Sequence, residues 1–182
     1  LYDADGIKLR TTHIIGSDTT VTDYCGNVIY ENGIPVKLLT EAGYVTLADS
    51  KYHYFVQDHL GNNRVVVDQS GNVEEVNHYY PFGGLLSSSV SNAVQPYKYN
   101  GKELDRKNGL DWYDYGARMY DAALGRWHAV DPMSEKYYSI SSYVYGLNTP
   151  HNCIDPDGQK IIFVNGYLGF GSPRGGGTYW GG

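Results

Sequence analysis

Hydrophobic and polar positions in the first half of the chain alternate in short runs that are separated by Gly, Asn and Asp. The run "YHYFV" predicts a strand, residues 58–63 a turn, "RVVVD" a second strand, and residues 69–72 another turn before "VEEVNHYY". Short β-branched and aromatic runs joined by Gly-Asn turns are typical of β-hairpins. A related unit recurs in "YDADGIKLR" and "DYCGNVIYENGIPVKLL". We therefore predict β-hairpin repeats over residues 1–83.

The pattern changes twice further along the chain. Residues 84–99 contain a Ser-rich run and predict a longer surface connection. Residues 100–158 carry dense aromatics among turn residues, with a short helix expected at residues 124–127 or in "PMSEKYYS", where Pro132 suits a first turn. The run "IIFV" at residues 161–164 predicts an apolar strand before a Gly-rich tail. We place a domain boundary between Gly158 and Gln159, so that residues 159–182 begin a separate unit.

The composition favours a mainly β fold and excludes some functions. Tyr occurs 19 times against four Phe, and Gly occurs 23 times. Aromatic rings pack well on a pleated surface, while Gly supplies positive φ angles at turns. A formal net charge of −6 argues against a nucleic-acid-binding surface, which needs a basic patch. No apolar run approaches the roughly 20 residues that a membrane-spanning helix requires.

The sequence predicts neither a metal site nor a cofactor site. Its six His residues are not arranged at metal-ligand spacing. No Gly-rich loop is followed by the Lys and Ser of a phosphate-binding loop. Cys25 and Cys153 form a single distant pair, which favours two unpaired thiols over a disulfide. The chain begins at Leu1 rather than Met, so we expect it to be part of a longer protein.

Several motifs, in their order along the chain, resemble one family. They are "DHLGNNRVVVDQSGNV", "YYPFG", "QPYKYNGKELDRKNGLDWYDYGARMYDAALGRW", "VDP", "EKYYSISSYVYGLN" and "IDPDG". The hairpins resemble the tyrosine-aspartate (YD) repeats of Rhs proteins, and residues 100–158 resemble the Rhs repeat-associated core domain of Bacteroidetes-type polymorphic toxins. The resemblance covers nearly all of residues 1–158. The remaining residues stand where such proteins change into a variable C-terminal effector.

This resemblance implies both a fold and a role. YD repeats of this family wind into a spiralling β-sheet that closes as a hollow shell, and the core domain forms a plug inside it. The chain would then be the encapsulation and delivery module of a secreted or cell-surface toxin used in interbacterial competition. Its implied partners are its own C-terminal effector, an immunity protein and components of a secretion system. In such a spiral without a thick apolar core, we expect Tyr and Trp rings to cover the sheet surface.

The resemblance also implies an aspartyl autoprotease. In related shell proteins the core domain cuts the chain just beyond its second Asp-Pro motif, using two carboxylates that share a proton. The matching aspartates are Asp131 and Asp155, and Arg126 matches an arginine that precedes the first motif and would pair with a carboxylate. The cleaved bond would lie near Gly158 and Gln159. Where the family has Leu after this Gly, the chain has Gln159, which would slow or abolish cleavage.

Other interpretations remain open on the residues alone. "DPDG" is also a good turn sequence, with Pro at its second position and Gly at its fourth. The chain could be a non-catalytic surface protein whose exposed aromatics bind carbohydrate or a protein partner. It could also be an enzyme fragment, because Asn165-Gly166 in the tail weakly resembles the oxyanion loop of α/β-hydrolases.

Overall fold

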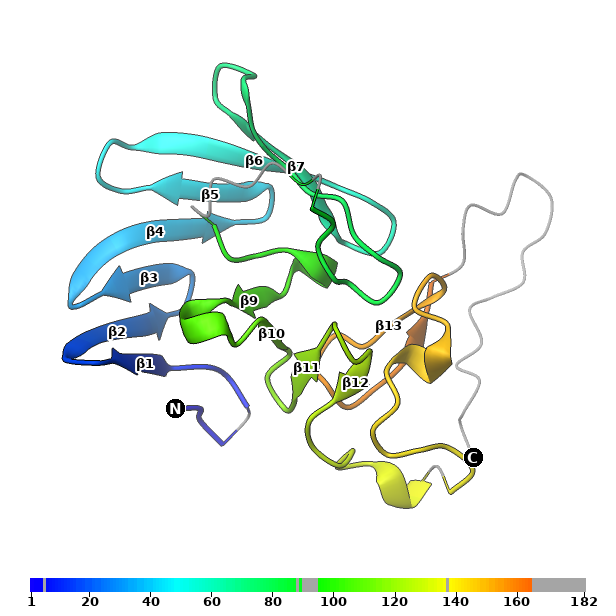
Figure 1. Cartoon of the computed structure of the whole chain (residues 1–182). Coiled ribbons are helices and arrows are strands. Elements are labelled where there is room, and N and C mark those ends of the chain that lie inside the picture. The colour runs from blue at the N-terminus through cyan, green and yellow to red at the C-terminus, as the bar shows by residue number, and fades with distance from the viewer. Residues whose placement is uncertain (5, 88, 90–94, 137, 165–182) are drawn as a thin grey trace.

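A computed structural model describes residues 1–164, except 5, 88, 90–94 and 137. Its largest element is an eight-stranded antiparallel sheet in which every strand pairs with its neighbours along the chain. The sheet curves as a wall past the rest of the protein (Figure 1). Its strands are β1 (Arg10–Ile15), β2 (Asp18–Cys25), β3 (Val28–Glu31), β4 (Ile34–Thr40), β5 (Gly43–Thr46), β6 (Lys51–Gln57), β7 (Asn63–Asp68) and β8 (Val73–Val76). The predicted β-hairpin repeats are confirmed.

A repeated five-residue sequence, Asp-x-x-Gly-Asn, makes two of the turns in this sheet. In the turn after β6, Oδ1 of Asp58 accepts hydrogen bonds from the backbone N–H of Leu60 and Asn62. In the turn after β7, Oδ1 of Asp68 accepts the same bonds from Ser70 and Asn72. The glycine of each turn has a positive φ, +75° in the first and +85° in the second. The predicted Gly-Asn turns therefore depend on side-chain capping as well as on glycine.

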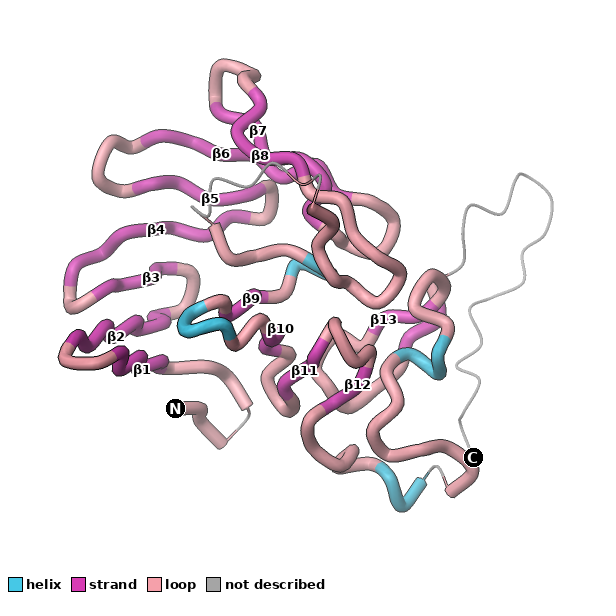
Figure 2. Tube along the Cα trace, viewed as in Figure 1, coloured by secondary structure: helices cyan, strands magenta, loops and turns pink. Residues whose placement is uncertain are grey.

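The second half of the chain forms small sheets and turns beside the wall (Figure 2). A four-stranded sheet has the order β12-β11-β10-β9, and β13 pairs with β14 in a separate hairpin. The strands are β9 (Glu103–Asp105), β10 (Trp112–Asp114), β11 (Met119–Asp121), β12 (Arg126–Trp127), β13 (Cys153–Ile154) and β14 (Ile162–Phe163). Four 3-10 turns are η1 (Tyr99–Gly101), η2 (Lys107–Gly109), η3 (Ser134–Lys136) and η4 (Gly146–Asn148).

The helix predicted at residues 124–127 is wrong, because these residues form a turn that leads into β12. The helix expected after Pro132 is only the single turn η3. Short Gly-rich segments of this kind cannot complete enough helical hydrogen bonds to offset the cost of the first turn. The apolar run at residues 161–164 does form a strand, β14. The Gly-rich tail and its hydrolase-like Asn165-Gly166 lie outside the described residues.

The expectation that the Tyr and Trp rings cover sheet surface is corrected for residues 99–145, where many of them form a buried aromatic cluster. Its members are Tyr99, Leu104, Tyr113, Tyr115, Tyr120, Trp127 and Tyr145. The Tyr hydroxyl groups do not need water, because three of them donate to backbone carbonyls of the "PFG" turn and those of Tyr115 and Tyr145 donate to Oδ1 of Asn100. Tyr99 donates to Pro81 at 3.0 Å, Tyr120 to Phe82 at 2.8 Å and Tyr113 to Gly83 at 3.0 Å. Tyrosine can therefore build this core, since each buried hydroxyl has a partner.

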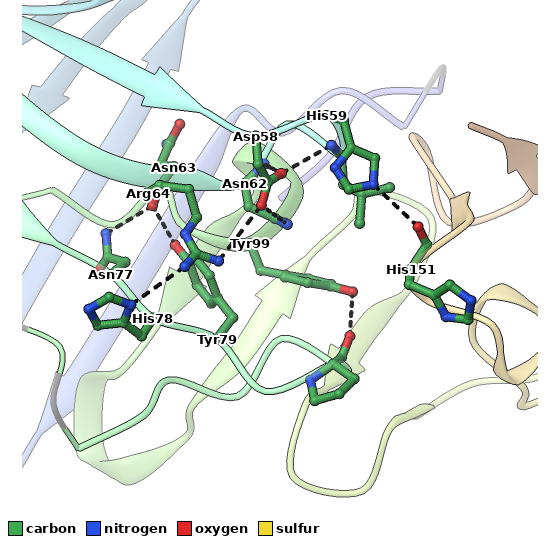
Figure 3. Close-up of polar contacts among 12 residues, drawn as sticks. Asp58, His59, Asn62, Asn63, Arg64, Asn77, His78, Tyr79, Tyr99 and His151 are labelled. Atoms are coloured by element: carbon green, nitrogen blue, oxygen red, sulfur yellow. Dashed lines mark hydrogen bonds and ion pairs between the residues drawn. The ribbon is translucent and has the colours of Figure 1, made fainter. Parts of the chain in front are cut away.

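Polar contacts join the wall to the core domain. Lys8, which precedes β1, lies 3.0 Å from a Glu103 oxygen and 2.9 Å from an Asp114 oxygen. At the other end of the wall, the His59 ring reaches the carbonyl oxygen of His151, while Arg64 lies between Asp58 and His78 within the wall itself (Figure 3). From the strands, His13 of β1 contacts Asp105 at 2.7 Å and the Tyr24 hydroxyl of β2 donates to Glu103 at 2.7 Å, so the core domain lies against the sheet.

The segment 84–99 is only partly the surface connection that we expected. Gln95, Lys98 and Tyr99 are buried, with exposed fractions of 2–3%. The Lys98 ammonium lies 2.5 Å from Glu75 of β8, and the Gln95 amide donates to the same carboxylate at 2.9 Å. A buried charge needs a partner of this kind. This part of the segment therefore fastens the last strand of the wall to the core domain.

Candidate functional site

The second Asp-Pro motif forms a turn whose first and last residues, Asp155 and Gly158, are buried in the core domain. Oδ1 of Asp155 accepts hydrogen bonds from the backbone N–H of Gly158 at 2.8 Å, Gln159 at 3.0 Å and Lys160 at 3.2 Å. Gly158 has a φ of +77°, and a Cβ atom there would lie 3.0 Å from the backbone nitrogen of Arg118. Both the backbone angle and the close approach require glycine at position 158.

Arg118 joins the two predicted aspartates. One of its terminal nitrogens lies 3.0 Å from Oδ2 of Asp131 and 3.3 Å from Oδ2 of Asp155. The guanidinium also packs over the Trp127 ring, with 4.2 Å between the Arg118 Cζ atom and the ring centroid. The side chain of Arg118 is 2% exposed, that of Asp131 17% and that of Asp155 0%. The site is therefore a buried cation between two carboxylates, one of which still reaches solvent.

Three consecutive carbonyl groups of the turn receive donors from the core domain. The Lys102 ammonium donates to the Pro156 oxygen at 2.5 Å, and the Ala117 N–H donates to the Asp157 oxygen at 3.2 Å. Nε of Arg118 donates to the Gly158 oxygen at 2.5 Å. A charged donor at a carbonyl oxygen stabilises negative charge that develops there. The Gly158–Gln159 peptide bond is therefore held and polarised.

The electrostatics of this site differ from those of an ordinary turn. Burial raises the pKa of Asp155 to about 6, although Arg118 and the Gly158 N–H both lower it. Desolvation dominates here because no part of this carboxylate faces water. Burial likewise lowers the pKa of Arg118, while Asp131 and Asp155 raise it. A carboxyl group with a pKa near neutrality can donate and accept a proton, as general acid–base chemistry requires.

The structure brings together Asp131, Asp155, Gly158 and Gln159 but not Arg126. Arg126 lies in β12 with an exposed side chain, and the ion pairs that we expected of it are made by Arg118. Strand alternation could have distinguished the two arginines. Arg118 immediately precedes β11 and is buried, as is Tyr120 two residues later, whereas Arg126 adjoins the buried Trp127 in β12 and is exposed.

A small cavity lies beside the Gly158–Gln159 bond. It has a volume of about 70 Å³, and apolar side chains of Ile140, Val144 and Leu147 line it together with Asp131 and Gln159. The chain following the turn also contributes Ile161 and Phe163 to the lining. The residue after Gly158 therefore faces a mainly apolar space, which suits Leu better than Gln.

Within the described residues, no group of three or more His, Cys, Asp or Glu side chains could hold a metal ion. The same residues include no helix with the length and hydrophobicity needed to cross a bilayer. Cys25 is exposed and Cys153 is buried, and both are free thiols.

A repeated antiparallel hairpin wall with a turn-rich aromatic core domain against one face defines a YD-shell protein. The teneurin YD-shell family profile matches residues 40–150, and the chain belongs to this family. Salivary gland surface protein 1 of Aedes aegypti is 38% identical over 91% of the chain and 6% of its own length. Toxin subunit YenC2 of Yersinia entomophaga is 36% identical over 53% of the chain and 10% of its own length.

A likeness to solved structures supports the same fold. The crystal structure of TcdB2-TccC3-Cdc42 superposes with a TM-score of 0.72 at 22% identity, over 87% of the chain and 9% of that structure's chain. The chain thus spans a tenth or less of the length of these relatives. The Rhs-type resemblance and the mainly β fold predicted from the sequence are confirmed.

Proposed function

We propose that the chain is the encapsulation and delivery module of a secreted Rhs-type toxin and that it frees a C-terminal effector by aspartyl autoproteolysis at Gly158–Gln159. The observation that carries this proposal is the placement of Arg118. It contacts Asp131 and Asp155 and also donates to the carbonyl of the bond to be cut. A turn with a purely structural role needs no second carboxylate and no buried guanidinium at its last carbonyl.

Each group has a role in the proposed reaction. Asp131, the more exposed carboxylate, is the general base that activates a water molecule for attack on the Gly158 carbonyl carbon. Arg118 stabilises the oxyanion through Nε. We assign Asp155 as the general acid that protonates the leaving Gln159 nitrogen, because its carboxyl group contacts this nitrogen, whose N–H its Oδ1 accepts at 3.0 Å in the uncut turn. Lys102 positions the substrate by holding the Pro156 carbonyl.

The proposed encapsulation role is supported by membership of the YD-shell family and by toxin subunits among the relatives. The wall would continue into further turns of a closed shell in the parent protein. Residues 1–83 would supply the last hairpins, 84–99 the connection, 100–158 the plug, and 159–182 the start of the effector. An immunity protein and secretion components are further proposed partners, and we propose a secreted or cell-surface location.

Intact mass spectrometry of the full chain and of its longest expressible parent tests this proposal. We expect the parent to lose everything after Gly158, and expect Asp131→Asn and Asp155→Asn to remain uncut. Asp121→Asn is the matched control, because Asp121 also caps a turn, through the Ala123 N–H, but lies outside the site. An uncut parent, or cutting that survives both substitutions, would refute autoproteolysis.

A second candidate is a non-catalytic surface protein that binds carbohydrate or a protein through exposed aromatics. It is favoured by the Aedes aegypti relative, which is named a surface protein. Tyr52, Tyr54 and Tyr80 are each at least 42% exposed and could supply contacts. Ligand binding that is lost when Tyr52 and Tyr54 are changed to Ser, in a chain that never cuts itself, would favour this candidate.

A further inference from the structure

We propose that residues 159–164, which include strand β14 (Ile162–Phe163), stay bound to the core domain after the Gly158–Gln159 bond is cut, so that the effector remains tethered without a covalent link. This inference rests on the proposed cleavage. Hydrolysis breaks the bond between the Gly158 carbonyl carbon and the Gln159 nitrogen. The water hydroxyl joins the carbon and a proton joins the nitrogen, which leaves a carboxylate and an ammonium group at neutral pH.

Both new charges already have partners of opposite sign. The Gly158 oxygen lies 2.5 Å from Nε of Arg118, so the new carboxylate would form a charge-assisted bond with it. The Gln159 nitrogen lies 3.0 Å from Oδ1 of Asp155 and 3.0 Å from Oδ1 of Asp157. An α-amino group has a pKa of about 8 and is charged below it. Cleavage therefore adds an attractive charge–charge interaction at each new chain end.

The segment beyond the cut has its own hold on the core domain. In the β13–β14 ladder, Cys153 lies opposite Phe163, and the Val164 N–H donates to the Asn152 oxygen at 2.7 Å. Ile161 and Phe163 line the small cavity beside Gln159. Addition of a strand to a partner, with alternate side chains in pockets, is a common mode of peptide binding. Here the bound peptide would be the first residues of the effector itself.

The contacts are limited, so the tether should be reversible. Ile162 is 49% exposed and Phe163 52% exposed, so the strand buries only about half of these side chains. A β-ladder of two residue pairs with partly buried side chains can hold a segment in place, but the interaction is weak enough for the segment to dissociate. Such a tether would hold the N-terminal end of the effector in place and still allow the effector to dissociate.

Native and denaturing mass spectrometry of the full 182-residue chain test the tether. We expect two fragments under denaturing conditions and, under native conditions, one species that is heavier than the uncut chain by one water molecule. Prompt separation of the fragments under native conditions after cutting would overturn the tether while leaving the proposed autoproteolysis intact.

Matched variants identify which contacts hold the segment. Phe163→Ser removes a ring from the cavity and should speed separation by about tenfold, whereas Ile162→Ser on the opposite face should have little effect. Asp157→Asn removes one partner of the new ammonium and should also speed separation. Asp111→Asn, at an exposed ion pair elsewhere, should not. Equal effects of the paired substitutions would count against strand retention.

A chain that stays uncut refutes the proposed function and leaves the docking to be judged by hydrogen exchange. In that case the Val164 amide, which donates to Asn152, should exchange slowly if β14 is docked by its own contacts. An amide that exchanges as fast as one in an unstructured peptide would overturn the docking as well.

Discussion

The raised pKa of Asp155 predicts a pH-dependent cost to folding that a single substitution should remove. In Asp155→Asn the amide keeps the shape and an oxygen acceptor but carries no titratable charge. The folded pKa is about 6 against an ordinary value of 3.8, and each unit corresponds to about 1.4 kcal/mol. The maximum effect on the free energy of unfolding is therefore about 3 kcal/mol.

The sign of the effect follows from proton binding. Between about pH 4 and pH 6 the folded chain keeps the proton on Asp155 while the unfolded chain has released it, so stability falls as the pH rises. Above the folded pKa the charged carboxylate destabilises the folded chain by the full amount. Below the ordinary pKa the carboxyl group is protonated in both states, and this destabilisation is absent. The free energy of unfolding of Asp155→Asn, measured relative to the parent, should therefore increase by about 2–3 kcal/mol as the pH rises from about 4 to about 7.

Urea unfolding followed by tryptophan fluorescence at both pH values measures this difference. The intact mass of each sample is checked first, and if the parent cuts itself, both chains are compared in an Asp131→Asn background. A stability difference between variant and parent that is the same at both pH values would refute the reasoning. It would mean that Arg118 and the backbone donors fully offset the burial of the Asp155 charge.

Asp68 supplies a control of opposite sign in the same kind of turn. Hydrogen bonds from the side chain and backbone N–H of Asn72 lower the pKa of Asp68 to about 2. This stability is present above the ordinary pKa and is lost as the pH falls through the folded value. Asp68→Asn should therefore destabilise the chain at neutral pH, with a deficit that shrinks on acidification.

Three further substitutions test the packing and the site. Gly43→Ala should destabilise the fold by about 3 kcal/mol in urea unfolding, because a Cβ atom would lie 2.0 Å from the backbone oxygen of His53. A variant as stable as the wild type would contradict the β5–β6 register. Tyr120→Phe should cost about 1–2 kcal/mol, since the Phe82 carbonyl loses its donor; no loss would mean that water replaces the hydroxyl. Gln159→Leu should speed self-cleavage about tenfold in a time course followed by mass spectrometry, because the adjoining cavity is mainly apolar. Slower cleavage would indicate that the Gln side chain is needed.

Local features of the fold were readable from the sequence. Alternating apolar runs and Asp-x-x-Gly-Asn turns specify hairpins through contacts within about ten residues, as around Asp58 and Asp68. The aromatic core was not readable in the same way. Tyr99 and Tyr120 bond to Pro81 and Phe82, which lie 18 and 38 positions away, so their burial depends on long-range packing.

The candidate site was likewise predictable from the sequence only in part. The Asp-Pro motifs marked Asp131 and Asp155, but spacing alone did not select Arg118 over Arg126. That choice depends on which side chains at each short strand meet the core: Arg118, just before β11, is buried like Tyr120 two residues later, whereas Arg126 in β12 is exposed. The alternation was present in the sequence, yet three-residue strands such as β11 are too short to be recognised with a definite phase.

The turn at Asp155 shows how a structural motif can be converted into a candidate reactive one. Asp68 and Asp155 both cap an Asp-x-x-Gly turn through Oδ1, and both following glycines have positive φ angles. Their pKa values are nevertheless shifted in opposite directions, because hydrogen bonds from Asn72 dominate at Asp68, whereas desolvation by burial dominates at Asp155. Arg118 acts against this desolvation, since it lowers the pKa of Asp155, and it also donates to the Gly158 carbonyl. The same turn backbone therefore holds an acid near neutrality where its carboxylate is fully buried, and Arg118 polarises the peptide bond beside it.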